Sequence, residues 1–210
     1  MRLLGIDEAG KGPVIGSMFV AGVVFDEGKL FDLAALGVRD SKELMPAKRE
    51  ILAAKISKLA EDHYILEVAP QVIDELRQVM TMNEIMVRSF AAVIQRLSFD
   101  KAILDAADVN PGRFGERVQS LSGTTAAILS EHKADSTHTV VAAASILAKV
   151  ARDASIRDIE RSVGQRIGSG YPSDPLTIKF LKGWVKANGD LPPFTRRSWK
   201  TAERIKASFI

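Results

Sequence analysis

The sequence predicts an α/β fold in which a mixed sheet is flanked by helices. Apolar, β-branched runs dominate the first 25 residues, strands alternate with helices through the middle of the chain, and only helical patterns follow. Hydrophobic residues make up 46% of the 210 residues, which is enough for a large buried core. Strands that come first in succession and later alternate with helices are typical of a sheet with both antiparallel and parallel pairs.

The expected elements follow from these patterns in chain order. Strands are predicted at 3–7 and 17–25, on either side of a glycine-rich turn, and at 63–69, 102–105 and about 126–130. Helices are predicted at 46–61, 70–80, 83–97, about 138–163, and near 175–188 and 198–208. The Gly and Pro residues at 168–172 mark the expected boundary between a main domain at 1–170 and a helical extension at 171–210.

The composition excludes several classes of protein. The chain has no cysteine, so disulfides, zinc-thiolate sites and a cysteine nucleophile are all excluded. No stretch approaches the roughly 20 apolar residues of a membrane span, and the predicted first strand leaves no room for a signal peptide. We therefore expect a cytoplasmic protein without a membrane partner.

Positive charge is concentrated in the last 35 residues. Residues 176–210 contain eight basic and two acidic residues, a net charge of +6, whereas the whole chain carries only +3. A cationic segment next to a carboxylate-rich body suits a protein that holds an anionic polymer. A solvated amphipathic helix would explain the same charges.

Four acidic residues lie at the ends of predicted strands or just before a helix. Asp7 and Glu8 follow the first apolar run, Asp105 closes the run at 102–104, and Asp135 precedes the long helix near 138. Neighbouring residues of a regular strand point to opposite faces, so we expect the first strand to end at this pair, where glycines allow a turn. Taken singly, Asp135 would serve as a helix cap and Asp105 as a turn residue.

Together, the four carboxylates indicate a metal site. Clustered carboxylates repel one another unless divalent cations neutralise them. Oxygen ligands select hard cations, so we expect Mg²⁺ or Mn²⁺. Two such ions about 3.5–4 Å apart can activate water, hold a phosphate and stabilise the leaving oxygen, so that no protein nucleophile is needed.

The motif at residues 7–13, D-E-A-G-K-G-P, resembles the ribonuclease HII signature D-E-A-G-R-G-P. The resemblance continues through Asp40-Ser41-Lys42, Asp105, residues 131–135, residues 144–149, residues 170–174 and residues 197–201. These motifs occur in the family's order, span essentially the whole chain and are most similar to the archaeal branch.

The resemblance implies a ribonuclease-H-like catalytic domain at 1–170, with the basic helical extension at 171–210 packed on it. It also implies that Asp7, Glu8, Asp105 and Asp135 are the catalytic residues and hold two divalent ions. The implied reaction is endonucleolytic cleavage 5′ of ribonucleotides, in RNA–DNA hybrids and at single ribonucleotides in duplex DNA, leaving 3′-hydroxyl and 5′-phosphate ends. Removal of ribonucleotides and RNA primers during replication and repair is the implied role.

Family roles carry over to several substrate-binding positions. Backbone groups of Gly10, Lys11 and Gly12 would read the 2′-hydroxyl that distinguishes RNA from DNA, and Tyr171 would stack on the sugar of the next nucleotide. Lys11 departs from the commoner Arg of the family and lacks its planar fork, which puts the strength of junction discrimination in doubt.

Phosphate contacts are predicted at Lys42, Ser145, Lys149, Arg197 and Lys200. Arg152 shares a helix face with two of these residues, although a solvated stripe would explain it equally well. Trp199 interleaves the cations of the tail and either contacts nucleic acid or packs the last helix.

Two other interpretations remain. Ribonuclease HIII shares the fold but usually carries an extra N-terminal domain, for which an acid at residue 7 leaves no space. A non-catalytic nucleic-acid-binding protein would use the basic tail alone and would not need the four acids. We also expect a monomer. A sliding clamp is a further candidate partner, but of the apolar residues that a clamp-binding C-terminus needs, the sequence offers only Ile205 and Phe209.

Overall fold

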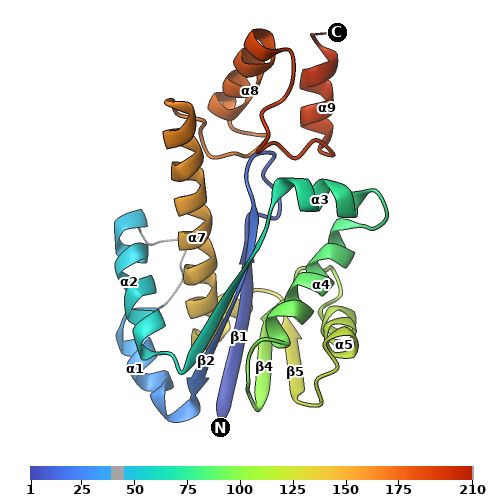
Figure 1. Cartoon of the computed structure of the whole chain (residues 1–210). Coiled ribbons are helices and arrows are strands. Elements are labelled where there is room, and N and C mark those ends of the chain that lie inside the picture. Colours follow the sequence, from blue (N-terminus) through green and yellow to red (C-terminus); the bar gives the residue numbers. More distant parts are fainter. Residues whose placement is uncertain (39–44, 210) are drawn as a thin grey trace. The chain divides into compact units, whose positions relative to one another are not determined.

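The computed structural model describes residues 1–38 and 45–209, which contain a five-stranded mixed sheet and several helices (Figure 1). The strands are β1 (Arg2–Ala9), β2 (Met18–Asp26), β3 (Asp62–Val68), β4 (Lys101–Asp105) and β5 (Ala127–Glu131). Their order is β3-β2-β1-β4-β5, with β1 antiparallel to β2 and parallel to β4, and with β4 parallel to β5. The predicted α/β class with a mixed sheet is confirmed.

The helices are α1 (Leu30–Ala35), α2 (Pro46–Leu59), α3 (Pro70–Arg77), α4 (Met82–Ile94), α5 (Pro111–Ser122), α6 (Ala134–Thr137), α7 (Thr139–Val163), α8 (Pro175–Asn188) and α9 (Lys200–Ala207). The six predicted helices are all present within a few residues, whereas α1, α5 and α6 were not predicted. Within the described part of the chain, no helix has the length and apolar character needed to cross a membrane.

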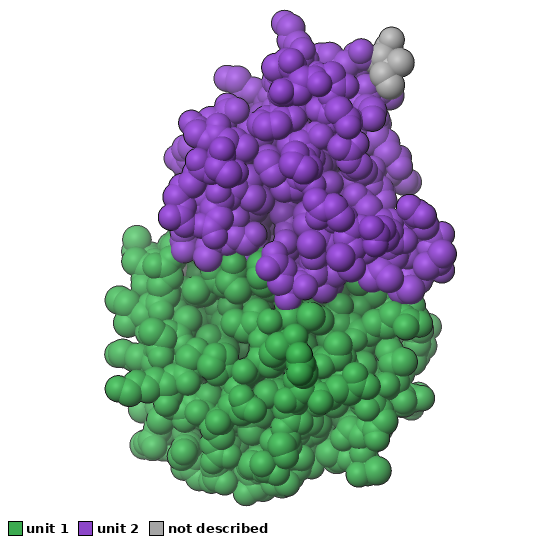
Figure 2. Space-filling model, in the orientation of Figure 1, with its two compact units in different colours: residues 1–9, 19–66, 82–151 green, residues 10–18, 67–81, 152–210 purple. Residues whose placement is uncertain are grey.

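The chain divides into two compact units, which Figure 2 colours separately. Unit 1 comprises residues 1–9, 19–66 and 82–151 and contains most of the sheet. Unit 2 comprises residues 10–18, 67–81 and 152–210, which include α3, α8, α9 and the second half of α7. The expected division of the chain at residue 170 stays a prediction.

Two glycines of unit 1 let helices pack closely on the sheet. A Cβ atom at Gly5 would lie 2.4 Å from the carbonyl carbon of Val140 at the start of α7, and one at Gly22 would lie 2.5 Å from Val93 of α4. In the β1–β2 ladder Ile6 pairs with Gly22, so the two glycines lie on opposite faces of the sheet. The helices α7 and α4 therefore cover opposite faces, as Figure 1 shows.

Unit 2 has a core of its own. Phe180, Trp184 and Phe194 form an aromatic cluster with ring centroids 5.8–6.1 Å apart. The buried Leu181 and Val185 of α8 belong to the same core. Aromatic and aliphatic burial of this kind fixes the segment between α8 and α9, which lies within the basic tail at 176–210.

Candidate active site

Three carboxylates of unit 1 meet near the C-terminal ends of two adjacent parallel strands. The β1–β4 ladder pairs Ile6 with Leu104, so Asp7 and Asp105 are the next residues on neighbouring strands. One carboxylate oxygen from each of Asp7, Glu8 and Asp105 lies within 4.8 Å of the other two. An all-oxygen set of this kind fits Mg²⁺ or Mn²⁺ and is unsuited to a soft metal ion.

The expectation that the first strand ends at Asp7 is wrong. The antiparallel ladder with β2 continues to the pair Ala9–Phe19, so Asp7 and Glu8 both lie within β1. The backbone N–H of Glu8 donates to Asp7 Oδ1 at 2.7 Å. Because only one oxygen of each carboxylate has to reach the site, the side chains of adjacent residues approach each other without a turn between them.

Asp7 is the buried member of the group, with 4% of its surface exposed. Burial, together with the negative charge of Asp105, raises the pKa of Asp7 to about 6, although hydrogen bonds and Lys149 oppose the shift. The side chains nearby thus compensate the buried carboxylate only in part. A bound divalent cation would supply the missing positive charge, so the residues present fit a metal.

A hydrogen-bonded chain connects Asp7 to α7. Lys149 Nζ donates to Ser145 Oγ at 2.8 Å, and the Ser145 hydroxyl is hydrogen bonded to the Asp7 carboxylate. Ser145 is fully buried. This geometry favours a role for Ser145 in holding Asp7, and the predicted phosphate contacts of Ser145 and Lys149 stay predictions.

Asp135 does not belong to the candidate metal-binding group of Asp7, Glu8 and Asp105, whose carboxylate oxygens lie within 4.8 Å of one another. This group comes from the described residues alone. It is buried in the short helix α6 and accepts a hydrogen bond from Ser136 Oγ at 3.3 Å. Its neighbour Ala134 donates its backbone N–H to Asp105 Oδ1 at 2.9 Å. The backbone next to Asp135 is therefore fixed to the carboxylate cluster, and its role as a metal ligand stays a prediction.

Unit 2 brings together the glycine-rich turn, Tyr171 and Arg152. Gly10 has a φ of +86°, a left-handed conformation that favours glycine. A Cβ atom at Gly12 would lie 3.5 Å from the Tyr171 ring, which is 39% exposed. The Arg152 guanidinium lies over that ring, 5.4 Å from its centroid. This stacking fixes the ring while leaving part of it accessible.

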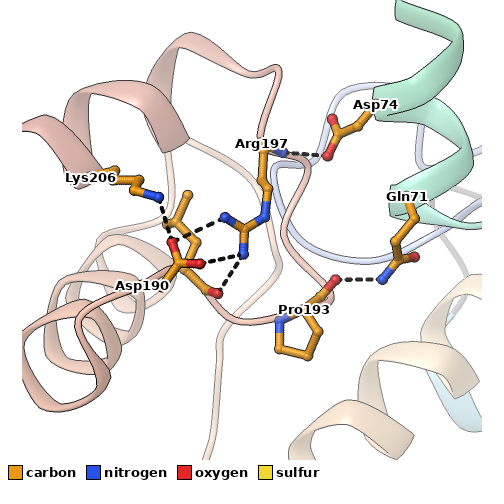
Figure 3. A network of polar contacts seen from close by, with 7 residues as sticks. Gln71, Asp74, Asp190, Pro193, Arg197 and Lys206 are labelled. Carbon is orange, nitrogen blue, oxygen red and sulfur yellow. Dashed lines mark hydrogen bonds and ion pairs between the residues drawn. The ribbon is translucent and has the colours of Figure 1, made fainter.

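In the basic tail, Arg197 is engaged within the protein (Figure 3). Its guanidinium donates to both carboxylate oxygens of Asp190 at 3.0 Å, and its backbone N–H donates to Asp74 at 2.8 Å. Lys206 also donates to Asp190, at 2.8 Å, and these hydrogen bonds hold the pKa of the Asp190 carboxyl well below its usual range. These contacts favour a structural role for Arg197, while Lys200 is exposed.

Arg196 belongs to the run of cations that suits a nucleic-acid backbone, but its role at the glycine-rich turn was not predicted. Its side chain is fully buried and donates to backbone carbonyls of the glycine-rich turn. Arg196 and Arg197 are adjacent residues of the same type, so only their contacts in the folded protein distinguish their roles. The predicted contact Lys42 lies outside the described residues.

Comparisons with known proteins identify the family to which the chain belongs. A family model described as Ribonuclease HII matches residues 4–202. The ribonuclease HII of Methanothrix thermoacetophila is 62% identical over 210 residues and is aligned over the full length of both chains. The ribonuclease H2 structure from Pyrococcus horikoshii OT3 matches with a TM-score of 0.94 at 41% identity, covering 100% of this chain and 99% of that one.

A ribonuclease HII from Archaeoglobus fulgidus, solved as a complex with PCNA, matches with a TM-score of 0.88 at 41% identity over 97% of this chain and 96% of that one. These matches confirm the ribonuclease-H-like fold that the sequence predicts. The family match also decides against the non-catalytic alternative. The chain belongs to the ribonuclease HII family and is an endoribonuclease.

Proposed function

We propose that the chain hydrolyses the phosphodiester bond 5′ of ribonucleotides, both in RNA–DNA hybrids and at single ribonucleotides embedded in duplex DNA. The products would carry 3′-hydroxyl and 5′-phosphate ends. The observation that carries the proposal is the approach of oxygens from Asp7, Glu8 and Asp105 to within 4.8 Å of one another. Such activity would serve ribonucleotide and primer removal during replication and repair.

Asp7, Glu8 and Asp105 would hold Mg²⁺ or Mn²⁺, with Asp135 as the fourth acid. Two bound ions would activate the attacking water, hold the scissile phosphate and stabilise the leaving oxygen. The chain's own residues prepare this site. Ser145 and the Glu8 N–H hold the Asp7 carboxylate in place, and the Ala134 N–H holds Asp105. A preorganised set of ligands needs little rearrangement when substrate and metal bind.

The glycine-rich turn and Tyr171 would select the ribonucleotide. The absence of a side chain at Gly12 would let a substrate oxygen approach the backbone of the turn beside Tyr171, and the 2′-hydroxyl is the group that marks a single ribonucleotide. Tyr171 has an accessible ring against which a sugar can pack. Phosphate contacts are proposed for Lys11, Lys42, Lys149 and Lys200, where a charged amine adds affinity without reading sequence.

Replacing Asp105 by Asn tests the catalytic proposal. The substitution removes a negative charge but little volume, so we expect cleavage to fall by about a hundredfold to a thousandfold, the scale of losing one strong electrostatic catalytic contact. Binding to a duplex with one ribonucleotide should persist, because phosphate contacts dominate affinity. A matched control is Asp158→Asn, which removes a largely exposed carboxylate paired with Arg161. Unchanged cleavage by the Asp105 variant would contradict the site.

We also propose a contact with a sliding clamp, supported by the A. fulgidus relative that was solved with PCNA. Of the two suggestive residues, Ile205 is 4% exposed in the unit 2 core, whereas Phe209 is 45% exposed. Phe209 would therefore make the contact. Phe209→Ala should weaken capture by an archaeal PCNA in a pull-down, and equal capture of the variant and the unaltered protein would count against it.

A further inference from the structure

Arg196 is a fully buried cation whose side chain is directed to one loop. Its Nε donates to the Gly16 carbonyl at 2.9 Å, its Nη1 to the Lys11 carbonyl at 2.9 Å and its Nη2 to the Gly10 carbonyl at 2.6 Å. All these residues belong to unit 2. The guanidinium of this one residue of the C-terminal tail therefore fixes three carbonyls of the glycine-rich turn.

Two further hydrogen bonds to the same turn come from this part of the tail. The backbone N–H of Arg196 donates to the Val14 carbonyl at 2.8 Å, and Trp199 Nε1 donates to the Gly12 carbonyl at 3.1 Å. The Arg196 guanidinium also lies over the Trp199 ring, 5.0 Å from its centroid. Arg196 and Trp199 thus hold the turn together. Five of the seven carbonyls of residues 10–16 accept hydrogen bonds from these two residues.

Arg196 supplies donors to the carbonyls of the turn at a cost in desolvation. Burying a guanidinium carries a desolvation cost even when its hydrogen bonds are made, and burial lowers the pKa of Arg196 to about 10. The group stays charged near neutral pH. An apolar side chain of similar volume would fill the same space without that desolvation cost, but it would leave the carbonyls of the turn without donors.

The carbonyl directions also determine where the amides of the turn point. The described residues contain no cis peptide bond, and in a trans peptide the N–H points opposite to the carbonyl of the preceding residue. The carbonyls of Gly10 and Lys11 point toward Arg196, so the N–H groups of Lys11 and Gly12 point away from it. These are backbone donors of the segment for which ribose recognition is proposed.

We infer that Arg196, assisted by Trp199, is a positioning residue that holds the glycine-rich turn so that its backbone donors are oriented toward the 2′-hydroxyl of a ribonucleotide. This inference rests on the proposed reading of that hydroxyl by the turn. It assigns to the buried arginine an indirect role in telling ribose from deoxyribose. Arg196 would act only through the backbone of the turn, without contacting the substrate.

The test is the preference in binding for a DNA duplex with one ribonucleotide over the same duplex made only of DNA. Binding is measured by fluorescence anisotropy with Ca²⁺ in place of Mg²⁺, and a gel checks that the duplex stays intact. We expect a preference of about tenfold for the unaltered protein, the scale of one or two hydrogen bonds. Arg196→Met should reduce the preference to less than about twofold, and all-DNA binding should change little because phosphate contacts persist.

The matched control is Val185→Ala, which creates a cavity in the same unit at a buried position of α8. It should lower thermal stability and keep the full preference. Arg196→Lys and Trp199→Phe remove only part of the donor set, so each should lose part of the preference and carry the test if Arg196→Met does not fold. A full preference in a folded Arg196→Met protein, or in both partial variants, would overturn the inference.

The experiment also separates this inference from the proposal on which it rests. Equal binding of the two duplexes by the unaltered protein would show that the turn does not read the 2′-hydroxyl and would overturn both. A preference in the unaltered protein that Arg196→Met retains would overturn only the role of Arg196.

Discussion

Replacing Asp7 by Asn should stabilise the metal-free protein while abolishing its metal response. Burial raises the pKa of Asp7 from 3.8 to about 6. Each pKa unit corresponds to 1.36 kcal/mol, so ionising this buried group costs the folded state about 3 kcal/mol relative to the unfolded chain. Asn has nearly the same shape and no charge, so the variant avoids this cost.

Asp7 destabilises the folded protein more strongly as the pH rises. The unfolded chain releases the Asp7 proton near pH 4, whereas the folded protein keeps it up to about pH 6. The folded state therefore binds more protons in this window, and the contribution of Asp7 to stability falls as the pH rises through it. Asp7→Asn should match the unaltered protein near pH 4 and exceed it by up to about 3 kcal/mol near pH 8.

The assay is urea denaturation in a chelator at about pH 4, 6 and 8, repeated near pH 8 with saturating Mg²⁺. The unaltered protein should gain stability from the ion through mass action, and the Asn variant should gain little. The exposed-site control Asp158→Asn should stay within about 0.5 kcal/mol throughout. An Asp7→Asn protein that is less stable than the unaltered one near pH 8 in chelator would refute the argument from burial.

Three further variants test other parts of the site and fold. Tyr171→Ala should lower kcat/KM at a single ribonucleotide by about tenfold, the scale of one stacking contact, and should affect long RNA–DNA hybrids less; equal losses on both substrates would contradict it. Ser145→Ala removes a hydrogen bond that lowers the pKa of Asp7, so the acid limb of the pH–rate profile should move to higher pH. Gly5→Ala should destabilise unit 1 by about 3 kcal/mol through overpacking against Val140, whereas Gly183→Ala, where a Cβ meets no atom within 4 Å, should not destabilise the protein.

Strong hydrophobic periodicity made most of the fold predictable. The apolar runs at β1, β2 and β4 and the long pattern at α7 place these elements within a few residues. The helix α5 was missed, although Asn110 caps it, Pro111 begins it and Gly123 ends it at a φ of +71°. Its two internal glycines weaken helix propensity, and its burial of Phe114 and Val118 stabilises it nonetheless.

The site was predictable where its chemistry is local in sequence. Carboxylates at the ends of apolar runs indicated Asp7, Glu8 and Asp105, because charges there are costly without a partner. The approach of Glu8 to Asp7 within a continuous strand was not predictable, since strand alternation argues against it. Arg196 and Arg197 are adjacent and identical in type, yet one fixes the glycine-rich turn and the other pairs with Asp190. Only long-range contacts decide between such roles.

Metal-dependent cleavage 5′ of a ribonucleotide is proposed to depend on Asp7 and Glu8 of β1 and Asp105 of β4. Its most direct test is cleavage of an end-labelled DNA duplex with one ribonucleotide, beside an all-DNA control, in Mg²⁺, Mn²⁺ or chelator. We expect a single cut 5′ of the ribonucleotide in either metal, with 3′-hydroxyl and 5′-phosphate ends, and no cut in chelator or in the control. Cleavage that persists in chelator, or that occurs only in longer RNA–DNA hybrids, would contradict the account.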